Sequence, residues 1–146
     1  MGLSILPYSD PIHRSQVIAL WESVFAYEAP HNRPSVAIDK KLAANDRLLF
    51  VAVAGNSVVG TIMAGYDGHR GWIYSVAVSP THRHQGIGTR LMFAAEDALR
   101  ALGCMKINLM ILSGNAGVAA FYKALGYSIE ERVQMGKIIP ENVPKA

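Results

Sequence analysis

The sequence is poor in cysteine: Cys104 is the single thiol among 146 residues. One thiol cannot form an internal disulfide, which favours a reducing compartment such as the cytoplasm. No basic segment followed by an apolar one opens the chain, and no apolar run approaches the roughly 18 residues that a membrane span needs. These absences predict a soluble, cytoplasmic protein that has no membrane partner.

Charge is also scarce, at 17% of the residues against 51% hydrophobic ones. That balance is typical of a packed globule and excludes a disordered chain, and the length fits a single domain over residues 1–146. The net charge is only 14 − 11 = +3. The basic patch of Arg70, His82, Arg83 and His84 is short and lacks a pattern of stacking aromatics, so we expect no nucleic-acid partner.

Hydrophobic periodicity and turn residues predict an alternating series of strands and helices. Asp10 is predicted to cap a first helix that begins at Pro11 and ends before Pro30. Three hairpin-linked strands followed by a β-α-β unit predict an α/β fold, with a sheet of mixed direction and helices on both faces. We expect strands at residues 5–6, 48–54, 58–66, 71–78 and 105–112, one or two more within 127–139, and further helices at 35–44, from 86 or 87 to 102, and at 116–125.

The predicted strand at residues 71–78 is apolar on both faces, which is typical of a central strand, and Pro80 ends it. Simple alternation assigns Trp72, Tyr74, Val76 and Val78 to one face and Ile73 and Ala77 to the other.

A turn with the sequence Arg-His-Gln-Gly-Ile-Gly, at residues 83–88, lies between this strand and an amphipathic helix. Gly86 and Gly88 lack Cβ atoms, so the backbone there can approach a ligand closely. The helix start offers unpaired N–H groups and the positive end of the helix dipole, which match a pyrophosphate. A tight turn without a ligand explains the two glycines as well. A Walker loop is excluded because Gly-Lys-Ser/Thr is absent, and Arg83 replaces the first glycine of a dinucleotide fingerprint.

Two motifs extend this pattern. Val-Ala-Val-Ser-Pro at 76–80 precedes the turn, and Asn115 precedes Phe-Tyr at 121–122 and Gly-Tyr at 126–127. Together they resemble motifs A and B of the GNAT N-acetyltransferase superfamily, and the chain is similar to its small bacterial members. The resemblance implies a mixed, mostly antiparallel central sheet of about 6–7 strands with helices on both faces. It also implies direct transfer of an acetyl group from acetyl-CoA to a primary amine, without a metal.

By the same resemblance, the backbone N–H groups of residues 84–89 hold the pyrophosphate of acetyl-CoA. The main chain of Val76 and Val78 pairs with the pantetheine arm like an added strand, and the Val78 N–H polarises the thioester carbonyl. Asn115 matches the family asparagine near the pantetheine, and a helix N-cap explains it as well. The implied cofactor-binding residues are Val76, Ala77, Val78, Arg83, His84, Gln85, Gly86, Ile87, Gly88, Thr89, Asn115 and Tyr122.

Tyr122 matches the general acid of the family, because a phenol with a pKa near 10 can protonate the departing thiolate. A core-edge aromatic beside Phe121 is the alternative interpretation. The resemblance assigns no general base on a strand, because the approximate counterparts of the positions where some family members carry a glutamate are Trp72 and Met110 here. The remaining candidates, each of which also fits a solvated surface residue, are Glu22, Glu28 and His31.

The missing strand carboxylate leaves a second function open, a non-catalytic module that binds or senses acyl-CoA. For the enzyme, the loop at residues 27–34 and the hairpin at 66–72 are expected to shape the acceptor pocket. Their aromatic and histidine side chains permit a peptide amine, a small amine or an amino sugar. The apolar C-terminal tail also suggests pairing with a second subunit in a homodimer.

Overall fold

The structure, a computed structural model, describes residues 2–25, 29–112 and 115–143. The chain divides into two compact units, Met1–Leu109 and Met110–Ala146. Among the described residues, the first unit holds the sheet and the helices α1 to α3, and the second holds α4 (Ala116–Ala124) and the tail. A single domain over residues 1–146 remains a prediction.

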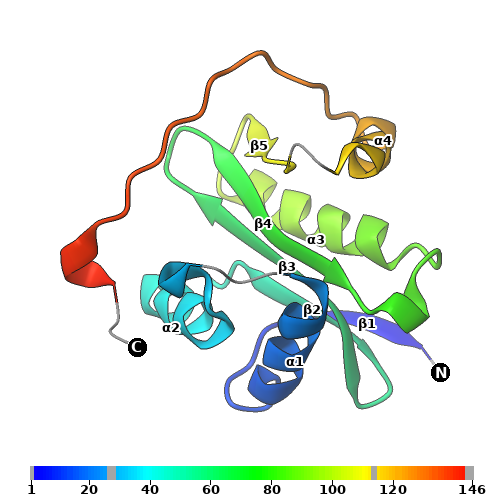
Figure 1. Ribbon diagram of the computed structural model, residues 1–146. Coiled ribbons are helices and arrows are strands. Elements are labelled where there is room, and N and C mark those ends of the chain that lie inside the picture. The colour runs from blue at the N-terminus through cyan, green and yellow to red at the C-terminus, as the bar shows by residue number, and fades with distance from the viewer. Residues whose placement is uncertain (1, 26–28, 113–114, 144–146) are drawn as a thin grey trace. The chain divides into compact units, whose positions relative to one another are not determined.

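The strands of the first unit lie in the sheet in the order of the chain (Figure 1). β1 to β4 pair as antiparallel neighbours, and β5 runs parallel to β4. The predicted α/β class with a mixed, mostly antiparallel sheet is therefore confirmed. The strands are β1 (Leu3–Pro7), β2 (Leu49–Ala54), β3 (Ser57–Tyr66), β4 (Gly71–Val78) and β5 (Ile107–Leu109).

The described residues form five strands, fewer than the six or seven expected. β5 takes up three residues of the predicted 105–112, and residues 127–139 form no strand. Both segments expose apolar side chains: Met105 is 95% exposed and Val133 is 93% exposed. Both segments are rich in residues that fit a half-buried sheet surface, so the sequence favoured strands here. Whether a neighbouring strand is there to pair with them cannot be read from the sequence.

Helices cover both faces of the sheet, as predicted. α1 (Arg14–Val24) and α2 (Pro34–Ala44) lie on one face, and α3 (Ile87–Ala101) lies on the other (Figure 1). In the part of the chain that the structure describes, no helix is both long and apolar enough to cross a membrane. Short 3-10 turns are η1 (Pro30–Asn32), η2 (Pro80–His82) and η3 (Pro140–Asn142).

The start of α1 differs from the prediction. The helix begins at Arg14 with His13 as its N-cap residue, and it ends at Val24. The Asp10 carboxylate accepts hydrogen bonds from Tyr8 Oη at 2.6 Å and Arg14 Nε at 2.7 Å, so it does not cap the helix. These two bonds lower the pKa of Asp10. A short acidic side chain just before a helix can accept hydrogen bonds from several nearby donors. In this structure it binds Tyr8 and Arg14 instead of the helix N-terminus.

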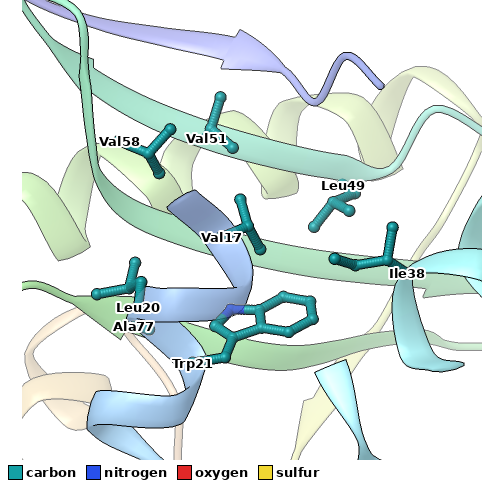
Figure 2. Close-up of a cluster of buried hydrophobic side chains, with 8 residues drawn as sticks. All are labelled: Val17, Leu20, Trp21, Ile38, Leu49, Val51, Val58 and Ala77. Atoms are coloured by element: carbon teal, nitrogen blue, oxygen red, sulfur yellow. The ribbon is translucent and has the colours of Figure 1, made fainter. Parts of the chain in front are cut away.

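An apolar cluster holds α1 and α2 against the sheet (Figure 2). Trp21 is its largest side chain and is 1% exposed. Burying each large apolar side chain contributes about 1.5–3 kcal/mol, so this layer is a main source of stability for the face that carries α1. The cluster consists of Val17, Leu20, Trp21, Ile38, Leu49, Val51, Val58 and Ala77.

α3 packs closely on the opposite face. A glycine of β3 permits this approach: a Cβ on Gly60 would lie 3.0 Å from Leu91 Cδ1, 3.2 Å from Ile87 Cγ2 and 3.1 Å from the Ala77 carbonyl oxygen. The side chains that α3 buries recur at helical spacing, as an amphipathic helix requires. They are Ile87, Leu91, Met92, Ala95 and Leu99.

Candidate functional site

The second half of β4 carries a β-bulge that simple alternation did not predict. Thr61 of β3 lies opposite Ala77, whereas Met63 lies opposite Tyr74, so β4 holds one extra residue between these pairs. Ser75 lies in the bulge with φ at +52°. This left-handed conformation costs a residue other than glycine about 1–3 kcal/mol and persists only where surrounding contacts hold it.

The bulge changes which face the following residues occupy. Gly71 faces α3, since a Cβ there would lie 2.9 Å from Leu99 Cδ1. Ile73 shares that face by alternation, but Ala77 belongs to the cluster under α1. The prediction that Ile73 and Ala77 share a face is therefore wrong. Val78, which lies opposite Gly60, is correspondingly on the α3 face.

A buried chain of hydrogen bonds joins α1 to this bulge. Trp21 Nε1 donates to Thr61 Oγ1 at 2.8 Å, and Thr61 Oγ1 donates to the Ser75 carbonyl oxygen at 2.9 Å. Thr61 is 0% exposed, and within the described ranges it is the only polar residue in the buried core. The sequence reasoning missed these three residues, because they are far apart in the chain and form no local motif.

Beyond the bulge, β4 extends past its partner β5. The β4–β5 pairs end at Ile73 and Leu109, five residues before the end of β4 at Val78. The Ser79 N–H donates to the Val59 carbonyl oxygen of β3 at 2.8 Å. Backbone groups alternate in direction along a strand, so the N–H and C=O of Val78 point to the other side, where β5 has ended.

The turn after β4 has the geometry of an anion-binding loop. His84 and Gly86 have φ of +63° and +78°, and Gly86 is the N-cap residue of α3, as the predicted helix start requires. The Arg90 N–H donates to the Gly86 carbonyl oxygen at 3.1 Å. In the described chain, α3 has no side-chain cap and no acidic residue in its first turn. The N–H groups without an intrahelical partner are those of Ile87, Gly88 and Thr89.

Arg83 connects the strand end to this turn. Its Nε donates to the Val78 carbonyl oxygen at 3.3 Å, and its side chain, like those of His84 and Gln85, is exposed. The fold therefore places residues 76–78 next to residues 83–89, with positive charge beside an uncapped helix N-terminus. Such an arrangement can hold a diphosphate.

The second unit holds the two predicted site residues of motif B. Tyr122 is a buried residue of α4, and its ring lies edge-on to Phe121 and Tyr127, with centroids 5.0 and 6.0 Å away. Burial raises the pKa of Tyr122 above the ordinary value of 10.0. Asn115 is the N-cap residue of α4, but its side chain makes no capping hydrogen bond. The capping interpretation therefore fits only its backbone position.

The candidate bases are solvent-facing or undescribed. Glu22 is exposed on α1, His31 is exposed on η1, and Glu28 lies outside the described residues. In the described ranges, no three His, Cys, Asp or Glu side chains form a group that could hold a metal ion.

One carboxylate near β4 was not among the predicted site residues. Asp67, in the β3–β4 hairpin, accepts backbone hydrogen bonds from Arg70 at 2.7 Å and His69 at 2.8 Å, and these bonds lower its pKa. The pKa of Tyr74 is raised mainly by the burial of its own phenol, and the negative charge of Asp67 raises it further. The hairpin thus holds an ionised carboxylate within electrostatic reach of β4, a placement that depends on how the hairpin folds.

This chain is similar to known proteins in sequence and in fold. The profile of the Acetyltransferase (GNAT) family matches residues 15–127. An acetyltransferase of Sodalis glossinidius is 41% identical over 128 residues, which cover 87% of this chain and 89% of that protein. An acetyltransferase of Yersinia pestis is 37% identical over 122 residues, 84% of this chain and 86% of that protein. A solved structure of AAC(6')-Iy in complex with the bisubstrate analog CoA-S-monomethyl-acetylneamine has a similar fold, with a TM-score of 0.78, 19% identity, and coverage of 95% of this chain and 99% of that one.

Proposed function

Since the chain belongs to the Acetyltransferase (GNAT) family of enzymes, we propose that it transfers the acetyl group of acetyl-CoA directly to a primary amine of a small molecule, peptide or protein. The observation that carries this proposal is the junction of β4 and α3. There, a strand that extends past its neighbour leads into an uncapped helix N-terminus.

Two parts of this junction suit two parts of acetyl-CoA. The backbone N–H groups of residues 84–89 suit the pyrophosphate, with Arg83 and His84 adding positive charge. The pantetheine arm is extended and carries amide groups, so it can bind along the open edge of β4 like an added strand. In this arrangement Val76, Ala77 and Val78 form the binding edge, and the Val78 N–H can polarise the thioester carbonyl.

The reaction exchanges one bond to the acetyl carbon for another. The lone pair of the amine attacks the thioester carbonyl, a C–N bond forms, and the C–S bond breaks. The departing thiolate takes a proton from the Tyr122 phenol, and the amine gives up a proton to a base or to water. Because burial raises the pKa of Tyr122, its phenol is protonated at neutral pH and is available as the acid.

A strong general base is not essential to this proposal. A base contributes about 10²–10⁴-fold, or roughly 3–5 kcal/mol, whereas holding the two reactants in position can contribute about 7–11 kcal/mol. Glu22 and Glu28 remain the candidates for base or acceptor binding. A chain of water molecules, or an acceptor amine of low pKa, would serve instead of either.

Calorimetric titration with acetyl-CoA tests the phosphate assignment. In Gly86→Glu a carboxylate stands at the N-terminus of α3, where like-charge contact with pyrophosphate costs several kcal/mol, so we expect about 100-fold weaker binding. Gly103→Glu is the matched control, because Gly103 also has a positive φ, of +88°, and also has open space around its Cβ position, but follows the other end of the same helix. Equal affinity of the two variants would remove the turn from the cofactor site.

The alternative function is a non-catalytic acyl-CoA-binding module. Trp72 favours it, because this side chain cannot accept a proton where some family members carry a glutamate. The module would bind acetyl-CoA but release no CoA thiol with any amine. A thiol-release assay over peptide amines, small amines and amino sugars separates the two functions, since turnover with one acceptor excludes the module.

A further inference from the structure

We propose that Thr61 is a positioning residue for acetyl-CoA: held by Trp21, it fixes the bulge at Ser75 and thereby directs the backbone of residues 76–78 toward the pantetheine arm. This inference rests on the proposed function, because it requires the arm to bind along the open end of β4. It concerns two buried side chains, those of Thr61 and Trp21, on the face of the sheet that α1 covers.

The chemistry of the three groups gives the hydrogen-bond chain a single direction. An indole N–H is only a donor, so Trp21 Nε1 must occupy a lone pair of Thr61 Oγ1 at 2.8 Å. The hydroxyl proton of Thr61 is then available for the Ser75 carbonyl oxygen at 2.9 Å. Since Trp21 is 1% exposed and Thr61 is 0% exposed, water cannot readily replace either bond.

The bulge needs such a clamp. It interrupts the β3–β4 ladder, and Ser75 has a φ of +52°, which a residue other than glycine rarely adopts unless its surroundings hold it there. Thr61 supplies the hold from the facing strand, next to the interrupted pair. Trp21 belongs to the core cluster under α1 (Figure 2). Its hydrogen bond to Thr61 Oγ1 in turn holds the Thr61 side chain in place.

The consequence reaches the cofactor edge through the register of β4. Backbone and side-chain directions alternate along a strand with a period of two, so a strand that loses its bulge turns every later residue to the other side. The Val78 N–H would then point toward β3 instead of the open edge. The turn at residues 83–88 is affected less, because His84, Gly86 and the start of α3 set its conformation. Its link to the strand end is the bond from Arg83 Nε to the Val78 carbonyl oxygen.

The experiment compares two ligands on three proteins. Acetyl-CoA contains both the pyrophosphate and the pantetheine arm, whereas adenosine 3′-phosphate 5′-diphosphate keeps the nucleotide with its diphosphate and lacks the pantetheine arm. We expect Thr61→Val, which keeps the volume but lacks the hydroxyl, to raise the Kd of acetyl-CoA by about tenfold or more, since small misplacements of binding groups are costly. The Kd of the fragment should rise much less, because the start of α3 keeps its conformation. Thr61→Ser, which keeps the hydroxyl, should restore acetyl-CoA binding.

Trp21→Phe provides a second route if Thr61→Val does not fold. It removes the indole donor and leaves the bond from Thr61 to Ser75, so we expect a smaller loss of affinity, again greater for acetyl-CoA than for the fragment. If the affinities for both ligands fall by the same factor, the variant is generally destabilised and the inference is overturned. Unchanged acetyl-CoA affinity in Thr61→Val and in Trp21→Phe would also overturn it. Failure of the wild-type protein to bind acetyl-CoA would instead overturn the proposed function, and this inference with it.

Discussion

At the scale of single residues, the proposed reaction assigns protonation of the departing thiolate to the Tyr122 phenol. Tyr122 is buried, and burial disfavours the phenolate, which is why its pKa is raised. A raised pKa keeps the proton on the phenol through the neutral range and weakens it as an acid. A thiolate is still a suitable acceptor, because the proton is delivered only as the C–S bond breaks.

We predict that Tyr122→Phe lowers kcat by about 10²–10⁴-fold, the usual contribution of a positioned acid. The Kd of acetyl-CoA should change little, because the phenyl ring preserves the packing against Phe121 and Tyr127. Steady-state kinetics with an accepted amine and calorimetry with acetyl-CoA measure the two quantities. Tyr127→Phe, which removes the hydroxyl of the neighbouring ring, is the control.

The pH dependence has a defined sign. The acid is active when protonated, so the wild-type rate should fall as the pH rises through the raised pKa of Tyr122, above its ordinary value. Tyr122→Phe should lack this alkaline decline. Equal kcat values and equal alkaline profiles for the two proteins would remove Tyr122 from catalysis.

At the scale of elements, the contact between α3 and β3 positions the start of α3. Gly60 permits this contact, and the backbone atom nearest to its Cβ position, the Ala77 carbonyl oxygen, lies only 3.1 Å away. That oxygen belongs to β4, so it cannot move without disturbing the strand that leads into the turn. Leu91, at 3.0 Å, is fully buried and has little room to give.

We predict that Gly60→Ala lowers the free energy of unfolding by about 1–3 kcal/mol, the usual cost of overpacking a core. The reduced entropy of the unfolded chain returns only about 0.4–1 kcal/mol, so the clash decides the sign. Urea unfolding measures the change. The matched control is Gly65→Ala in the same strand, where the nearest heavy atom to a Cβ is Lys41 Nζ at 3.9 Å, and where we expect little effect. Equal stability of the two variants would contradict the tight packing of α3 on β3.

Several elements were predictable because their signals are local. The β4 limits, the start of α3 at the glycine turn, and α4 follow from periodicity and from the positions of glycine and proline. The bulge at Ser75 was not predictable, since it is held by Thr61 and Trp21, which belong to other elements. The partners of Asp10, Tyr8 and Arg14, are close to it in the chain, but the sequence does not show which of several nearby donors its carboxylate binds.

At the scale of the whole molecule, the tail exposes apolar side chains that a second copy of the chain could cover. Val133 is 93% exposed and Met135 is 90% exposed, and both would lie on one side of an extended segment. Exposed apolar groups that recur along one side of a segment are typical of an interaction surface. Pairing of the tail with another subunit, as a homodimer, remains a prediction from these residues.

We predict that the wild-type protein self-associates, and that Val133→Glu combined with Met135→Glu shifts it toward the monomer, because charges resist burial in an apolar interface. Sedimentation velocity over a range of concentrations measures the mass. Ile12→Glu is the control, since Ile12 is 71% exposed but lies in the other unit. A wild-type protein that stays monomeric throughout would contradict the prediction.

The sequence by itself determined the family, the α/β class, the order of the elements and the place of the Arg83–His84–Gln85–Gly86 turn. The family follows from the resemblance of two motifs. The other features depend on periodicity and on the conformational limits of glycine and proline, which act over a few residues. The tertiary structure alone decided that β5 stops short of the end of β4, that a bulge turns Val78 to the open edge, and that Trp21 and Thr61 hold that bulge. The physical reason is that strand pairing and buried hydrogen bonds join residues far apart in the chain, and their partners exist only once the core has formed.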